Sequence, residues 1–88
     1  MKVTNMVSSK GNTVPNQFII ESANAREFQS YKTTVIRQDL NTGATYIDVG
    51  YPFSKTTSKY ASLFLDKTSK EIKRKIKSGE YITAELNK

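Results

Sequence analysis

The chain changes its hydrophobic pattern once, at Gly50-Tyr51-Pro52-Phe53, and this change limits the folds open to it. Proline pushes the residue before it out of the helical region, so Tyr51 is expected to be extended and to separate two kinds of structure. Before this break lie short runs of β-branched and aromatic residues, which are typical of strands. After it, apolar residues recur at helical spacing. The pattern predicts an α+β domain with its sheet first and its helices last.

Three strands are predicted ahead of the break. They cover Gln17–Ser22, Glu27–Gln38 and Ala44–Val49, with turns at Ala23–Arg26 and Asp39–Gly43 between them. The alternation of apolar and polar residues slips inside the second strand, which predicts a bulge near Gln29-Ser30. Because these connections are too short for crossovers, the three strands are expected to form an antiparallel meander.

A first helix is predicted to start near Ser54 to Thr57, where hydroxyl side chains can cap it. Its buried stripe is expected to be Tyr60, Leu63 and Phe64, which follow the i, i+3, i+4 spacing of one helix face.

A second helix is predicted from about Ser69, because Thr68-Ser69-Lys70-Glu71 matches a capping box. Ile72 and Ile76 form its inner face, and Gly79 follows where a C-terminal cap is needed. The last segment, Tyr81–Leu86, is expected to be a short strand or an extended tail.

These elements predict an α+β fold in which a three- to four-stranded antiparallel sheet is followed by two short C-terminal helices, packed on one sheet face. Residues 1–16 are expected to be a flexible or edge-strand N-terminal arm, and residues 17–88 a single domain. The expected core is Phe18, Ile20, Val35, Ile47, Val49, Leu63, Phe64, Ile72 and Ile76. The uncovered sheet face and the free edges leave room for a homodimer.

The residue types that the chain lacks narrow its chemistry. It has no Cys, so neither a disulfide nor a thiolate metal site can form, which fits a reducing cytoplasm. It has no His, the usual general base near neutral pH, and its carboxylates are scattered without metal-site spacing. No apolar run approaches the roughly 18 residues that cross a bilayer. We therefore expect a cytoplasmic protein that is not an enzyme, has no catalytic residue, metal or other cofactor, and has no membrane partner.

The net charge of +6 is concentrated in one quarter of the chain. Residues 55–77 hold eight cations and two anions, whereas the remaining residues hold six of each. A charge gathered in this way favours a polyanionic partner, with nucleic acid, either DNA or RNA, as the leading candidate.

Four cations of the second predicted helix share one of its faces. Lys70, Lys73, Arg74 and Lys77 follow the i, i+3, i+4, i+7 spacing, and Ile72 and Ile76 point elsewhere. Like charges at these spacings repel by a few tenths of a kcal/mol per pair, and a phosphate backbone would remove this repulsion. The stripe is therefore a candidate nucleic-acid-binding surface. The alternative is a solvated face that keeps the protein soluble.

The segment Ser54-Lys55-Thr56-Thr57-Ser58-Lys59 places hydroxyls and two lysines at the start of the first helix. Free backbone N–H groups at a helix start can hold a phosphate, so Lys55 and Lys59 are candidates to extend the basic surface. The segment lacks the glycines of a P-loop. Ordinary N-capping is the alternative interpretation.

Tyrosines near the predicted sheet lie close in sequence to Lys32 and Arg37. Aromatic side chains flanked by cations can stack the bases of a single strand, and Tyr46 and Tyr51 are the better candidates, ahead of Tyr31. The alternative is that these rings fill a thin core and keep their hydroxyls at its rim.

Three strings in the chain form a set. They are Asn16-Gln17-Phe18-Ile19-Ile20 leading to Phe28-Gln29-Ser30-Tyr31, then Tyr51-Pro52-Phe53-Ser54-Lys55-Thr56-Thr57-Ser58-Lys59-Tyr60, then Ile76-Lys77-Ser78-Gly79-Glu80-Tyr81. Together they resemble a family of small uncharacterised proteins encoded by bacteriophages and prophages, chiefly of Gram-positive bacteria. The chain departs from that pattern at Pro52-Phe53, where many members have tryptophan or tyrosine, and at Tyr60, where they have His. The resemblance implies a protein that acts in the host cytoplasm, and it brings no established activity.

The functions left open fall into three classes. The first is a phage-encoded, non-enzymatic accessory protein that binds nucleic acid through its basic C-terminal helix. The second is an inhibitor or modulator of a host protein, for example an anti-defence or anti-CRISPR protein, although a charge of +6 argues against DNA mimicry. The third is capture of a signalling nucleotide by the segment 54–59.

Overall fold

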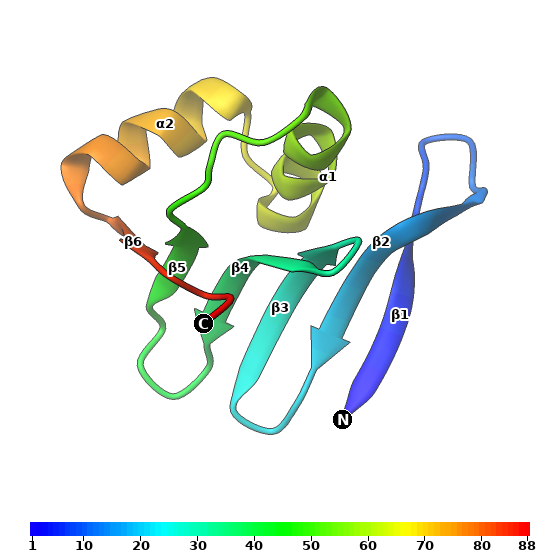
Figure 1. Ribbon diagram of the computed structural model, residues 1–88, viewed down its shortest axis with the longest axis horizontal. Helices are drawn as coiled ribbons and strands as arrows, with labels where there is room; N and C mark the ends of the chain where they lie inside the picture. The colour runs from blue at the N-terminus through cyan, green and yellow to red at the C-terminus, as the bar shows by residue number, and fades with distance from the viewer.

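A six-stranded mixed sheet carries two helices on one face (Figure 1). The structure is a computed structural model and describes all 88 residues. In chain order the elements are β1 (Lys2–Val7), β2 (Thr13–Glu21), β3 (Ala25–Ser30), β4 (Thr33–Asp39), β5 (Thr45–Asp48), α1 (Lys55–Leu65), α2 (Ser69–Ser78) and β6 (Tyr81–Ala84). The α+β class is confirmed. The expectation of three to four antiparallel strands is wrong, because six strands are present and one pair is parallel.

Strand order in space follows strand order in the chain, from β1 at one edge to β6 at the other. Strands β1 to β5 pair antiparallel with their neighbours, as short turns require. β6 pairs parallel with β5. A parallel pair needs a long crossover, and α1 and α2 form that crossover between the two strands (Figure 1).

The segment predicted as one strand, Glu27–Gln38, lies within a β-hairpin. β3 ends at Ser30, the chain turns through Tyr31-Lys32, and β4 begins at Thr33 opposite Ser30. Tyr31 adopts a left-handed backbone conformation with φ of 56°, and its N–H donates to the carbonyl of Asn16 at 2.6 Å. The turn contains none of the Gly, Asn, Asp or Pro residues that mark most tight turns, so the sequence did not reveal it.

The slip in alternation has a second cause beside this turn. The β3–β4 register shifts between Phe28, which faces Ile36, and Gln29, which faces Thr34. The irregularity thus lies beside Gln29, close to the predicted place, and the extra residue is Val35 on the paired strand β4. As a result, two consecutive residues, Val35 and Ile36, are both completely buried.

The two ends of the chain add strands to the sheet. Within residues 1–16, for which a flexible arm and an edge strand were both left open, β1 forms one sheet edge and β2 begins at Thr13. At the other end, Tyr81–Ala84 forms β6, and the chain then turns back toward β4. There the Asn87 side chain accepts from the N–H of Thr34 at 2.6 Å and donates to the Thr34 carbonyl at 2.9 Å.

Both helices start, and α2 also ends, at the local signals that predicted them. The Ser54 side chain accepts from the Thr57 N–H and caps α1. In α2 the Thr68 hydroxyl accepts from the Glu71 N–H, while the Glu71 carboxylate accepts from the Thr68 N–H, which completes the capping box. Gly79 closes α2 with φ of 86°, a conformation that glycine adopts without strain.

The core lies between the helices and one sheet face. The rings of Phe28 and Phe64 stack with centroids 5.9 Å apart, and the Arg26 guanidinium lies 4.2 Å from the centre of the Phe64 ring. Of the expected core, Val35, Ile47, Phe64 and Ile72 are buried, and Ile76 packs against the cluster. Ile36 and Tyr81 are buried members that the expected list omitted.

Four residues of the expected core do not lie in it. Leu63 is 53% exposed, because α1 turns Leu65 and Ala61 inward instead, and Val49 is 56% exposed just beyond the end of β5. Phe18 and Ile20 are half-buried on the opposite sheet face, because Ile19 between them packs against the core.

Neither helix has the length and apolar character needed to cross a membrane.

The two neighbouring positions in α1 allow a matched test of this packing. Phe64→Ala is expected to lower the free energy of unfolding by about 3–5 kcal/mol, because it removes a buried ring that stacks on Phe28. Leu63→Ala is expected to cost less than about 1 kcal/mol, since its side chain is half in solvent. Urea unfolding followed by circular dichroism measures both, and equal costs would contradict the helix orientation.

Candidate nucleic-acid interface

The four predicted cations of α2 lie together on its outer side. Ile72 is completely buried and Ile76 is half-buried on the inner side, so Lys70, Lys73, Arg74 and Lys77 are all exposed to solvent. None of these four takes part in any of the three ion pairs in the molecule. We call these four side chains the α2 stripe. Their charges are not neutralised within the chain.

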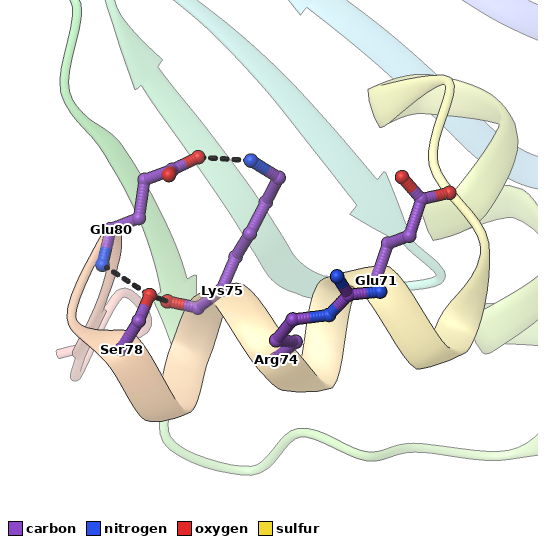
Figure 2. Close-up of a pocket in the computed structure, with 5 residues that line it drawn as sticks. All are labelled: Glu71, Arg74, Lys75, Ser78 and Glu80. Atoms are coloured by element: carbon purple, nitrogen blue, oxygen red, sulfur yellow. Dashed lines mark hydrogen bonds and ion pairs between the residues drawn. The ribbon is translucent and has the colours of Figure 1, made fainter.

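Lys75, the fifth cation of α2, differs from the α2 stripe because its charge is paired within the protein. Its ammonium group forms an ion pair with Glu80 (Figure 2). The same group lies 5.6 Å from the centre of the Tyr81 ring. The hydrogen bond to Glu80 raises the pKa of Lys75. Burial raises the pKa of the Tyr81 hydroxyl beneath it. Lys75 therefore links the end of α2 to the start of β6. The unpaired positive charges of α2 are those of the α2 stripe.

Glu71 lies between Lys67 and Arg74 in sequence, and its carboxylate caps the start of α2. It accepts from the Thr68 N–H at 3.2 Å and from the Thr68 hydroxyl at 3.1 Å. These hydrogen bonds, first the backbone one, lower the pKa of Glu71, and the charges of Lys67 and Arg74 lower it further. Figure 2 shows Arg74 beside Glu71, but the two groups form no ion pair.

Two shallow hollows meet at Glu71 and connect α1 to α2. One is lined by Glu71, Arg74, Lys75, Ser78 and Glu80 (Figure 2). The other is lined by Lys59, Ser62, Leu63, Asp66, Lys67, Thr68 and Glu71. Lys59 and Lys67 therefore border a hollow that adjoins, at Glu71, the hollow lined by Arg74. Lys67 was not among the predicted site residues, because its position depends on how the link between the helices folds.

The start of α1 is mainly a structural cap. The Thr57 hydroxyl shares a hydrogen bond of 2.9 Å with Ser30 and accepts from the Ser54 hydroxyl at 3.2 Å. These hydroxyls are thus occupied within the protein. Lys55 is exposed at the first residue of α1, about 15 Å along the helix axis from the link to α2, so it lies apart from the surface around Glu71.

The two predicted tyrosines do not lie beside the α2 stripe. Tyr46 points to the sheet face opposite the helices, because its neighbour Ile47 is completely buried beneath them. Tyr51 packs against the core and makes an edge contact with Phe53 at 6.3 Å between centroids, and burial raises its pKa.

Tyr31, which ranked behind these two, is 60% exposed at the β3–β4 turn and borders a hollow with Ser54 and Thr57. Its exposure depends on the turn that the sequence did not reveal.

No group of three or more acidic side chains lies close enough together to hold a metal ion, and the chain has no Cys or His.

The fold and this surface define a class of protein: a small α+β domain whose excess positive charge lies on one helical layer. The chain belongs to a family of unknown function (DUF8033), whose model matches residues 1–80. Neither a curated protein nor a solved structure matches the chain.

The lowered pKa of Glu71 gives a pH-dependent stability. A carboxylate with a pKa below its ordinary value of 4.5 stabilises the fold above that pH, and this contribution disappears as the pH falls through the folded pKa. Glu71→Gln is therefore expected to be less stable than the wild type at pH 7 and to approach its stability as the pH falls below 4.5. Urea unfolding across this pH range measures the difference.

The control for this prediction is Glu21→Gln. Glu21 is exposed and its side chain makes no hydrogen bond. The difference in free energy of unfolding between Glu21→Gln and the wild type should therefore change less with pH. A Glu71→Gln curve parallel to the wild-type curve at every pH would contradict the capping role of the charge.

Proposed function

We propose that this protein is a non-enzymatic nucleic-acid-binding protein that contacts phosphates through the α2 stripe, with Lys59 and Lys67 extending the contact across the link to α1. The supporting observation is that Lys70, Lys73, Arg74 and Lys77 are exposed, adjacent and free of ion pairs. The phage or prophage origin implied by the three sequence strings is part of this proposal, with action in the host cytoplasm.

The arrangement of charge suits a phosphate backbone. The α2 stripe extends over about 10 Å of helix axis from Lys70 to Lys77, which equals the axial rise of roughly three phosphates of one strand of B-DNA. Each like-charged neighbour in the stripe costs the isolated helix roughly 0.2–0.5 kcal/mol, and phosphates would convert this repulsion into attraction while releasing counterions. Contacts of this kind carry no sequence information, so binding is expected to be largely independent of sequence.

Base stacking is not part of this proposal. Tyr46 lies on the other sheet face, and Tyr51 is packed against the core. Affinity would then come mainly from phosphate contacts and fall steeply with salt.

A double substitution in the α2 stripe tests the proposal. Lys73→Glu with Arg74→Glu reverses the two central charges, and binding to random-sequence oligonucleotides is expected to be abolished at a salt concentration of about 50 mM. Fluorescence anisotropy of labelled single and double strands, titrated at several salt concentrations, measures this. For the wild type, the logarithm of the affinity should fall linearly with the logarithm of the salt concentration.

The matched control is Lys10→Glu with Lys88→Glu, which changes the net charge by the same amount but lies outside the helical layer. It should retain most of the binding and the salt slope. If the control loses as much affinity as the stripe variant, net charge rather than the α2 stripe drives binding. A wild type that binds no oligonucleotide at low salt would contradict the proposal and favour a host protein as the partner.

A further inference from the structure

The sheet face that the helices leave open carries an ordered row of side chains across all six strands. Strand register places six residues side by side in this order: Val3, Ile20, Glu27, Arg37, Tyr46 and Ile82. Each is the direct cross-strand partner of the next, and side chains at this spacing touch their neighbours. We call this set the open-face row.

The alternation of side chains along each strand determines which sheet face the row lies on. Phe28 and Ile36 are completely buried under α1 and α2, so Glu27 and Arg37, one residue away, point to the opposite face. Tyr81 is buried in the core, so its neighbour Ile82 is turned outward and is 43% exposed. At the other edge, Val3 is 57% exposed.

Charge separates the two faces of the molecule. Every cation of the segment 55–77 lies in α1, in α2 or in the link between them, and the net +6 of the chain belongs to that layer. The open-face row holds one anion and one cation, joined by an ion pair of 3.2 Å between Arg37 Nη1 and Glu27 Oε2. Two copies of the chain therefore repel each other through their helical layers, but not through this face.

The row is also complementary to itself. Read from either edge, it has two apolar side chains, then a charged pair, then two apolar side chains. A two-fold axis parallel to the strands, passing between β3 and β4, would place Glu27 against the Arg37 of a second copy. The same axis would place Ile20 against the second Tyr46 and Val3 against the second Ile82. An isologous contact requires this self-matching pattern.

We infer that the open sheet face is the interface of a homodimer, in which two sheets pack face to face with their strands aligned. Such sheets stack about 10 Å apart, with their strand directions within about 30°. Apolar side chains at both ends of the row supply the buried surface, and the central charges set the register. The two basic helical layers then face outward on opposite sides of the dimer.

The C-terminal tail limits the interface without covering the row. Asp48, two residues beyond Tyr46 on the same strand face, accepts from the Leu86 N–H at 3.0 Å and from the Asn87 side chain at 3.1 Å. The tail is therefore held at one end of the open face, beside β4 and β5 (Figure 1). This inference goes beyond the proposed nucleic-acid binding and does not depend on it, since dimer formation is measured without oligonucleotide.

Two charge reversals test the register directly. Glu27→Arg creates a row with two cations and Arg37→Glu a row with two anions, so each variant alone would place like charges against each other. Sedimentation equilibrium at about 1–100 µM, where weak dimers become populated, should give the wild type twice the 9.9 kDa of one chain. Each variant alone should give the monomer mass.

An equal mixture of the two variants is the decisive sample. In a mixed dimer the Glu27→Arg chain presents two cations and the Arg37→Glu chain presents two anions. If the sheets meet as inferred, both central contacts between the chains then join opposite charges. The ion pair within each chain stays broken in the mixture, so recovery of the dimer mass comes from contacts between chains alone. A mixture that remains monomeric overturns the inference, as does a wild type that sediments as a monomer.

A second pair of variants guards against a charge reversal that fails to fold. Ile82→Lys changes an apolar end of the open-face row, whereas Leu63→Lys changes a similarly exposed residue of the helical layer. We expect sedimentation equilibrium to give a monomer for Ile82→Lys and an unchanged dimer for Leu63→Lys. Circular dichroism should show that both variants are folded. A dimer in which Leu63→Lys breaks the contact and Ile82→Lys does not would place the interface on the helices and overturn the inference.

Discussion

The parallel pairing of β6 with β5 determines how this molecule is organised. A parallel neighbour can be reached only by a crossover, and a crossover lies over one face of the sheet. The crossover here is α1 and α2, which together carry the cationic segment of the chain. One strand pairing therefore places the core, the helices and the net charge on the same side. Neither helix covers the other side of the sheet.

The helical half of the fold could be predicted from the sequence because its signals are local. A capping box needs only Thr68 and Glu71, three residues apart, and Gly79 ends α2 by its own backbone freedom. The α2 stripe follows from the same local geometry, since four residues at helical spacing share a face wherever the helix packs. Leu63 shows the limit of this reasoning. Its spacing fits the buried stripe, but the way α1 packs on β3 buries Leu65 instead.

The sheet could be predicted only in part because its pairing joins distant residues. The hairpin turn at Tyr31-Lys32 has no turn residue, and Tyr31 is held in its left-handed conformation by a hydrogen bond to Asn16 on another strand. The parallel partner of β5 lies more than thirty positions further along the chain, so nothing near Tyr81 in the sequence specifies it. The position of Tyr46 on the open face follows from the alternation with Ile47, which was part of the expected core and is buried. The bulge at Val35, in contrast, is set by the register between β3 and β4.

The concentration of positive charge on one face of the molecule bears on both proposals. Under the first proposal, a nucleic acid would meet few free carboxylates at the helical layer, because Asp66 and Glu71 are the only acidic residues in the segment 55–77 and Glu80 beside it is paired with Lys75. Glu71 is already committed to Thr68, so it competes weakly for Arg74. A second copy of the chain would be repelled by the helical layer but not by the open-face row, where Glu27 and Arg37 form an ion pair. If both proposals hold, one crossover gives the molecule two faces that differ in charge and therefore favour different partners.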